Sequence, residues 1–194
     1  MTKRQKEILG LFLMIFSILS FIGLFSHDIT EQPGGFSYGE FPVNNYLGYY
    51  GIWIPYFHYS LLGYTSIIFP IILGILGYFL LAKKDIKLCL TPIFYILIIG
   101  LYISMLMSFI ATVSNTDVLS NHFSGIIGIS LNKFIYDFLG PIGSLIFLLI
   151  ALILLITSVF QISINELFIG IFKFVKIFVG KTYIFFNAIF KFFI

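Results

Sequence analysis

Charged residues are scarce in this chain of 194 residues, because Asp, Glu, Lys and Arg together make up only 10% of it. A soluble domain carries about 25% charged residues. Hydrophobic residues make up 60% of the chain, and the mean hydropathy is +1.09. A globule this apolar would have too few polar groups to cover its surface. The composition therefore excludes an ordinary soluble domain and indicates a chain that folds in lipid.

Residues that bind metals or form disulfides are also few. The single cysteine, Cys89, lies in an apolar run and excludes an intramolecular disulfide. The three histidines are far apart in the sequence and lack the spacing of a metal-binding pair; they are His27, His58 and His122. We therefore predict no metal site and interpret Cys89 as a small apolar residue packed within the membrane.

One short motif resembles a nucleotide-binding loop but is incomplete. Gly180–Thr182 reads Gly-Lys-Thr, like the end of a Walker A loop, in which backbone amides surround the phosphates. Val175 occupies the position where that motif requires an earlier glycine. We therefore predict no cofactor-binding residues, no catalytic residues and no enzyme activity for this chain.

Long uncharged runs divide the chain into four predicted membrane spans. About 20 apolar residues cross the ~30 Å hydrocarbon layer of a bilayer. The predicted spans are residues 8–26, 63–81, 88–113 and 140–158. The first run follows three basic residues, as in a signal peptide, but it is longer than a signal peptide requires and no Ala-x-Ala cleavage site follows it. We therefore interpret it as a retained span.

Two further segments precede the second and fourth spans and are predicted to lie in the outer interface. Residues 48–60 are rich in Tyr and include Trp53, and residues 125–138 are semi-polar. Tyr and Trp favour the headgroup region of a bilayer. Residues 1–160 are accordingly predicted to form a four-helix membrane domain with two outer interfacial helices.

Positive charges lie on one side of this predicted domain. Of the 11 Lys and Arg residues, three precede the first span, three lie between Lys83 and Lys87, and four follow the fourth span. Only Lys133 lies on the opposite side. The positive-inside rule places the side with the other lysines and arginines in the cytoplasm. We therefore predict a multi-pass protein with both termini cytoplasmic.

The sequence contains an internal duplication at an offset of 77 residues. Residues Gly48, Gly51, Ile52, Phe57, Tyr59, Leu62 and Gly63 match Gly125, Gly128, Ile129, Phe134, Tyr136, Leu139 and Gly140. Further upstream, residues 20–22 match residues 108–110 at an offset of 88, and the difference of 11 residues falls in the first outer loop. The repeated unit is a span, an outer loop, a Gly-x-x-Gly interfacial segment and a return span. This pattern predicts two parallel-repeat hairpins related by a pseudo-twofold axis along the membrane normal.

The six repeated glycines are interpreted as a structural motif, since glycine lets helices approach closely in lipid. They are Gly48, Gly51, Gly63, Gly125, Gly128 and Gly140. Ligand binding by these glycines is the minority interpretation.

The last segment, residues 161–194, is predicted to be an amphipathic tail on the cytoplasmic membrane surface. Its lysines share one face of a helix that is otherwise rich in Ile, Phe and Val; they are Lys173, Lys176, Lys181 and Lys191. A basic stripe of this kind is typical of a helix lying on an anionic leaflet. A fifth span over residues 167–190 would bury three lysines, each costing about 2.5–3.5 kcal/mol. Whether the tail forms one helix or two stays open, because Gly170 and Gly180 interrupt it.

Several short motifs together resemble the N-terminal four-helix membrane domain of the FtsK/SpoIIIE DNA translocases. The resemblance rests on Phe25–Asp28 at the end of the first span, on Asn45–Gly51, and on the two Leu-Gly pairs that enter the second and fourth spans. His27 and Ile29 depart from the Tyr and Pro that the family often has. The resemblance covers roughly residues 8–162.

This resemblance implies a membrane anchor that targets a DNA pump to the division septum of the bacterial plasma (inner) membrane. It implies contact with the lipid bilayer, self-association as a hexamer, and binding to other division proteins. DNA would be contacted only through a C-terminal ATPase motor, which is expected beyond Ile194. The chain is then expected to be either a fragment or a paralogue that lacks the motor.

Two other function classes are weighed against the anchor. A small transporter or channel subunit would need polar groups at the bilayer midplane, and the predicted spans contain no charged residue. The nearest outer carboxylate, Asp137, is expected to pair with Lys133 one helical turn away. The other alternative is an orphan membrane protein, such as a lipid sensor or a toxin antagonist.

Overall fold

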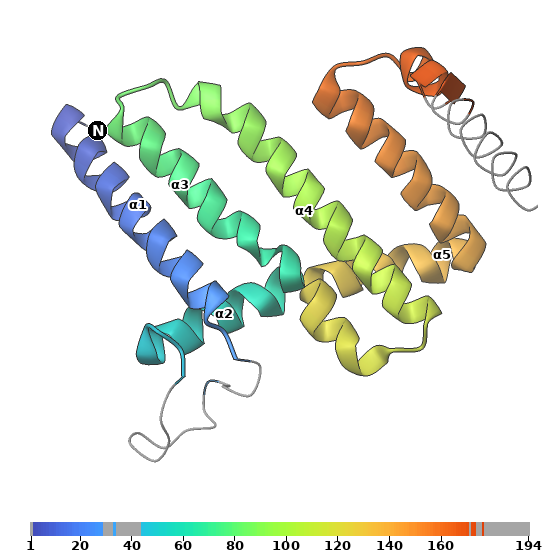
Figure 1. Ribbon diagram of the computed structural model, residues 1–194, viewed down its shortest axis with the longest axis horizontal. Helices are drawn as coiled ribbons and strands as arrows, with labels where there is room; N and C mark the ends of the chain where they lie inside the picture. The colour runs from blue at the N-terminus through green and yellow to red at the C-terminus, as the bar shows by residue number, and fades with distance from the viewer. Residues whose placement is uncertain (1, 29–32, 34–43, 171, 174–175, 177–194) are drawn as a thin grey trace, which may run out of the picture. The chain divides into compact units, whose positions relative to one another are not determined.

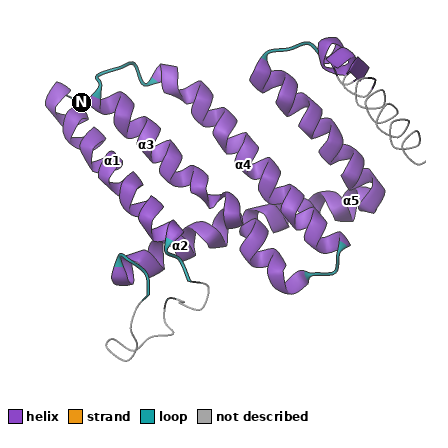
Figure 2. Ribbon diagram, viewed as in Figure 1, coloured by secondary structure: helices purple, strands orange, loops and turns teal. Residues whose placement is uncertain are grey.

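The computed structural model describes residues 2–28, 33, 44–170, 172, 173 and 176, and every regular element within these ranges is a helix (Figure 2). The elements are α1 (Lys3–Phe25), α2 (Gly48–Leu62), the 3-10 helix η1 (Gly63–Ile67), α3 (Ile68–Leu81), α4 (Lys87–Val113) and α5 (Asp117–Phe160). Two compact units divide the chain, Met1–Leu148 and Leu149–Ile194.

Four stretches of helix are long and apolar enough to cross a membrane. They are Lys3–Phe25, Gly48–Leu81, Lys87–Val113 and Phe123–Phe160. The prediction of an all-α membrane protein with four spans is therefore confirmed. The finer limits of the spans, the interfacial segments and the division of the chain after residue 160 stay predictions.

The first helix, α1, begins ahead of the apolar run because its end is capped. The Thr2 hydroxyl accepts a hydrogen bond from the Gln5 amide at 3.2 Å, and the Gln5 side chain accepts one from the Thr2 amide at 2.8 Å. This reciprocal pair is a capping box, which satisfies amides that otherwise lack a partner at a helix start. The helix therefore includes the charged residues that precede the predicted span.

The segment that returns across the membrane is broken at Gly63. Helix α2 ends there, and η1 separates it from α3. Pro70 lies in the first turn of α3, where its missing amide removes no helical hydrogen bond. Figure 1 shows α1 and α3 side by side, with α2 lying across their lower ends.

Small residues bring α1 and α3 into close contact. A Cβ atom added to Gly77 would lie 2.9 Å from the Gly10 carbonyl oxygen, and one added to Gly10 would lie 2.7 Å from the Leu81 amide nitrogen. The buried Ser17 hydroxyl also donates a hydrogen bond of 2.7 Å to the Pro70 carbonyl. In lipid, helices associate through such small-residue packing and interhelical hydrogen bonds, because apolar side chains gain little by leaving acyl chains.

The second half of the first unit packs α4 against α5 as far as Leu148. Met105, Phe109 and Leu148 form its buried apolar cluster, and the Tyr102 hydroxyl donates to the Leu148 carbonyl at 3.2 Å. Non-helical backbone interrupts α5 at Gly125 and Gly140.

Candidate functional site

A buried asparagine fastens the end of α1 to the start of α2. Asn45 is only 4% exposed. Its side-chain nitrogen donates hydrogen bonds to the carbonyls of Gly23 at 3.2 Å and Ser26 at 3.1 Å, and its oxygen accepts one from the Leu47 amide at 3.0 Å. The last carbonyls of a helix have no partner within the helix. Asn45 therefore provides partners for the end of α1 while it fixes the turn that leads into α2.

Gly51 is the position on α2 that faces this asparagine. A Cβ atom at Gly51 would overlap the Asn45 side-chain oxygen and would lie 3.0 Å from its nitrogen. The absence of a side chain at Gly51 is thus what lets the buried amide reach the end of α1.

The second half of the first unit has a comparable arrangement between α4 and α5. The buried Ser104 hydroxyl donates a hydrogen bond to the Ser124 carbonyl, and the Asn132 amide donates to the Thr112 hydroxyl at 3.0 Å. A Cβ atom at Gly128 would overlap the Ser104 hydroxyl and would lie 2.6 Å from the Ser104 carbonyl oxygen. Gly51 and Gly128, which match in sequence, both face a buried polar contact with a preceding helix or loop.

The four remaining glycines of the motif share an unusual positive φ angle. The φ angles are 59° at Gly48, 59° at Gly63, 62° at Gly125 and 70° at Gly140. These residues form two pairs at the offset of 77, one at the start and one at the end of each Gly-x-x-Gly segment. Residues with a Cβ rarely adopt this conformation.

Gly63 and Gly125 meet at the junction between the two hairpins. A Cβ atom at Gly63 would overlap the Phe123 carbonyl, and one at Gly125 would lie 2.5 Å from the Leu62 and Gly63 amide nitrogens. Beside them, the ring centroids of Tyr64 and Phe123 are 5.0 Å apart. In Figure 1 the start of α5 approaches the turn between α2 and α3. The hairpins therefore touch backbone to backbone at this point.

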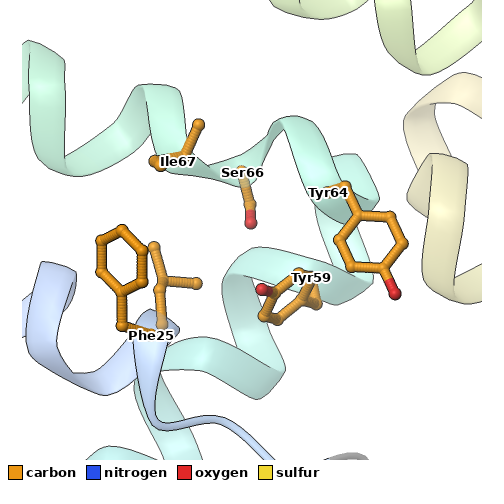
Figure 3. A pocket seen from close by; sticks show the side chains of 6 residues that line it. Phe25, Tyr59, Tyr64, Ser66 and Ile67 are labelled. Atoms are coloured by element: carbon orange, nitrogen blue, oxygen red, sulfur yellow. The ribbon is translucent and has the colours of Figure 1, made fainter.

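A small apolar cavity lies next to this junction (Figure 3). Its volume is about 200 Å³, and it is lined by Leu24, Phe25, Tyr59, Tyr64, Ser66 and Ile67. The Ser66 hydroxyl is buried and has no hydrogen-bond partner among the described residues. At the rim, the His27 ring stacks on Tyr59 with centroids 4.8 Å apart. The lining is mainly apolar, with the hydroxyl-bearing residues Tyr59, Tyr64 and Ser66, and it contains no nucleophile paired with a base.

One electrostatic prediction is wrong. Lys133 and Asp137 are both exposed, and no ion pair joins them. An exposed pair is worth only about 0–1 kcal/mol, which does not hold two solvated side chains together. Among the described residues, an ion pair of 2.6 Å instead joins Lys83, just after α3, to Glu7 of α1.

The second unit contains the start of the basic tail. Residues 164–170 are helical, and a second capping box precedes them. The Glu166 carboxylate accepts from the Ser163 amide at 2.9 Å, and the Ser163 hydroxyl accepts from the Glu166 amide at 3.1 Å. The hydrogen bonds from Ser163 lower the pKa of the Glu166 carboxyl.

Only part of the predicted membrane-surface stripe falls within the described residues. Lys173 and Lys176 are exposed on helical backbone, whereas Lys181 and Lys191 lie outside the described residues. The surface role of these four lysines stays a prediction.

No metal-binding cluster of three or more His, Cys, Asp or Glu side chains occurs in the part of the chain that the structure describes. The side chains that hold the outer ends together are instead neutral and polar. The sequence pattern assigns no role to Asn45 or Ser104, although each lies near a glycine of the repeated motif. Asn45 and Ser104 are recognised only by a contact in space: the side chain of each lies against a glycine of the motif, Gly51 and Gly128 respectively.

Comparison with known protein families gives one match. The family described as the 4TM region of DNA translocase FtsK/SpoIIIE matches residues 2–172 of the chain. No curated protein and no solved structure shows significant similarity to it.

Proposed function

Because the chain belongs to the FtsK/SpoIIIE DNA translocase family, as its 4TM region, we propose that it is the septal membrane anchor and assembly module of such a translocase. The family match over residues 2–172 is the observation that carries this proposal. The process served is cell division and chromosome segregation. The motor that pumps DNA is a separate part of the family's architecture, so residues 1–194 would act by holding and positioning it.

The chain's partners in this role are the lipid bilayer, other copies of itself and other division proteins. The four apolar helices support the first of these. The bilayer concerned is the bacterial plasma (inner) membrane. DNA would be reached only through the motor. The exposed Lys173 and Lys176 support a tail that lies on an anionic leaflet.

Targeting is tested with a fluorescent protein fused to the full chain in dividing bacterial cells. Midcell signal is expected to exceed that of a membrane dye in the same cells, because the dye corrects for the two apposed membranes of a septum. A fusion that follows the dye along the whole cell outline would contradict septal targeting.

The orientation of the chain is tested separately with a topology reporter. Thr116 lies in the short polar connection between α4 and α5, with no Lys or Arg beside it. A reporter that works only outside the cytoplasm is expected to be active when it is inserted after Thr116, and inactive when it is inserted between Lys83 and Lys87. The reversed pattern would place both termini on the outside.

A further inference from the structure

The two hairpins contribute turns from different positions of the repeat to the junction at Gly63 and Gly125. The first hairpin contributes the turn Leu62–Tyr64, and the second contributes the turn Phe123–Gly125. At the offset of 77, the corresponding turns are Leu139–Pro141 in the second hairpin and Tyr46–Gly48 in the first. Each hairpin therefore carries both kinds of turn, and the contact within the chain occupies only one of each.

The glycines of the two turns outside the junction have the same positive φ, but open space lies where their Cβ atoms would be. A Cβ atom at Gly63 or Gly125 would overlap or crowd backbone atoms, whereas one at Gly48 or Gly140 would meet nothing within 4 Å. The exposure of side chains at matched positions also differs between the junction and the other turns. Leu62 is 2% exposed, and its counterpart Leu139 is 44% exposed.

The aromatic residues Phe123 and Tyr46, which match in the repeat, also differ in exposure. Phe123 is partly buried against Tyr64 in the junction, with ring centroids 5.0 Å apart. Its counterpart in the first hairpin, Tyr46, is also aromatic and is 84% exposed. Acyl chains cover most exposed apolar side chains of a membrane protein, so exposure alone does not select a surface. The positive φ of the matched glycines distinguishes both turns from the lipid-facing helix surfaces. At the Tyr46–Gly48 turn the matched aromatic residue does so as well, whereas Pro141 stands where the junction has Tyr64.

A contact between two different surfaces can be repeated from one molecule to the next. Such heterologous contacts produce a ring when the rotation closes and an open filament when it does not. A chain built from two similar hairpins, joined by one such contact, presents one unused surface of each kind. A second copy of the chain supplies the complementary surface for each of them.

We propose that the turn Leu139–Pro141 of one copy binds the turn Tyr46–Gly48 of the next copy, and so repeats between chains the contact that Gly63 and Gly125 make within one chain. This head-to-tail interface deepens the assembly role proposed above and rests on it. The interface lies in the first compact unit, at the ends of the Gly-x-x-Gly segments.

Cysteine cross-linking of the full chain in membranes tests this interface. Cys89→Ala first removes the native thiol, which is buried in α4. Tyr46→Cys combined with Pro141→Cys is then expected to give dimers and higher oligomers on a non-reducing gel after mild oxidation, and a reductant is expected to reverse them. These positions match Phe123 and Tyr64, so Tyr64→Cys with Phe123→Cys is the internal control. That pair is expected to form a disulfide within one chain and no ladder.

Two further controls decide the geometry. Copies that carry only Tyr46→Cys, mixed with copies that carry only Pro141→Cys, are expected to stop at dimers, because each chain then has a single thiol. Tyr46→Cys with Phe134→Cys places the second thiol on another exposed position of α5 instead of Pro141, and it is expected to give little product.

Four results would overturn the interface. The first is the absence of a ladder, and the second is a ladder of equal yield for the Phe134 control. The third is cross-linking by either single variant alone, which indicates a symmetric contact. The fourth is the failure of the internal pair, because the proposal copies that contact. The assay needs no dividing cells, so a ladder without midcell enrichment would support the interface and count against septal targeting alone.

Discussion

Gly125→Ala is expected to be among the most destabilising single-methyl substitutions in this chain. Gly125 combines a φ of 62° with a ψ of 173°, an extended conformation that is essentially confined to glycine, and forcing a residue with a Cβ into it costs about 1–3 kcal/mol. The added atom would also lie 2.5 Å from backbone atoms of Leu61, Leu62 and Gly63, which cannot rotate away as a side chain would. Overpacking of this kind costs about 1–3 kcal/mol more.

Gly140→Ala is the matched control for this substitution. Its φ of 70° carries the same conformational cost, but the new Cβ would meet no atom within 4 Å. Measured by reversible unfolding of the monomer in dilute mixed micelles, Gly140→Ala is expected to lose about 1–3 kcal/mol. Gly125→Ala is expected to exceed it by the cost of the backbone contact. Equal losses at the two sites would mean that the hairpins do not touch at Gly125.

Gly51→Ala is expected to be strongly destabilising in the wild-type chain and nearly harmless when Asn45 is also replaced by Ala. In the wild type the new methyl overlaps the Asn45 side-chain oxygen, so the asparagine must leave its three hydrogen bonds. A buried polar group left without a partner costs about 1–3 kcal/mol. With Asn45→Ala that loss has already occurred, and the space is vacant.

In the Asn45→Ala background, Gly51→Ala is expected to be neutral or to stabilise α2, because Ala is favoured over Gly inside a helix by about 0.5–1 kcal/mol. A double-mutant cycle of unfolding free energies measures the coupling, which is expected to be at least about 1 kcal/mol for residues in direct contact. Additive losses would show that Gly51 does not face the asparagine.

The matched site in the second hairpin is expected to behave differently. A Cβ at Gly128 would overlap the Ser104 hydroxyl, but it would also lie 2.6 Å from the Ser104 carbonyl oxygen and 2.7 Å from its carbon. Ser104→Ala removes only the hydroxyl. Gly128→Ala is therefore expected to stay destabilising in the Ser104→Ala background, and a full rescue there would contradict the backbone contact.

Much of this architecture could be predicted without coordinates because the bilayer imposes it. Backbone groups must be paired within lipid, so long uncharged runs become helices whatever their order of apolar residues. Glycine spacing in the two Gly-x-x-Gly segments also marked positions where a side chain is excluded or the backbone conformation is unusual. These are local properties, and they can be recognised along a single segment.

The partners of those glycines could not be predicted in the same way. The i, i+4 spacing of Lys133 and Asp137 suggested a pair, whereas the ion pair found among the described residues joins Glu7 of α1 to Lys83, just after α3. Asn45 and Ser104 are ordinary polar residues in the sequence, and their roles depend on carbonyls more than a dozen residues away.

The sequence by itself determined the four apolar helices, the excess of basic residues on one side of them and the duplicated glycine motif, because hydrophobicity and backbone preference act residue by residue. Only the tertiary structure decided which copy of each glycine contacts the other hairpin. Gly63 and Gly125 match Gly140 and Gly48 in the repeat and share their positive φ, but only Gly63 and Gly125 have another backbone against them. That difference depends on how one hairpin packs on the next, and no local pattern records it.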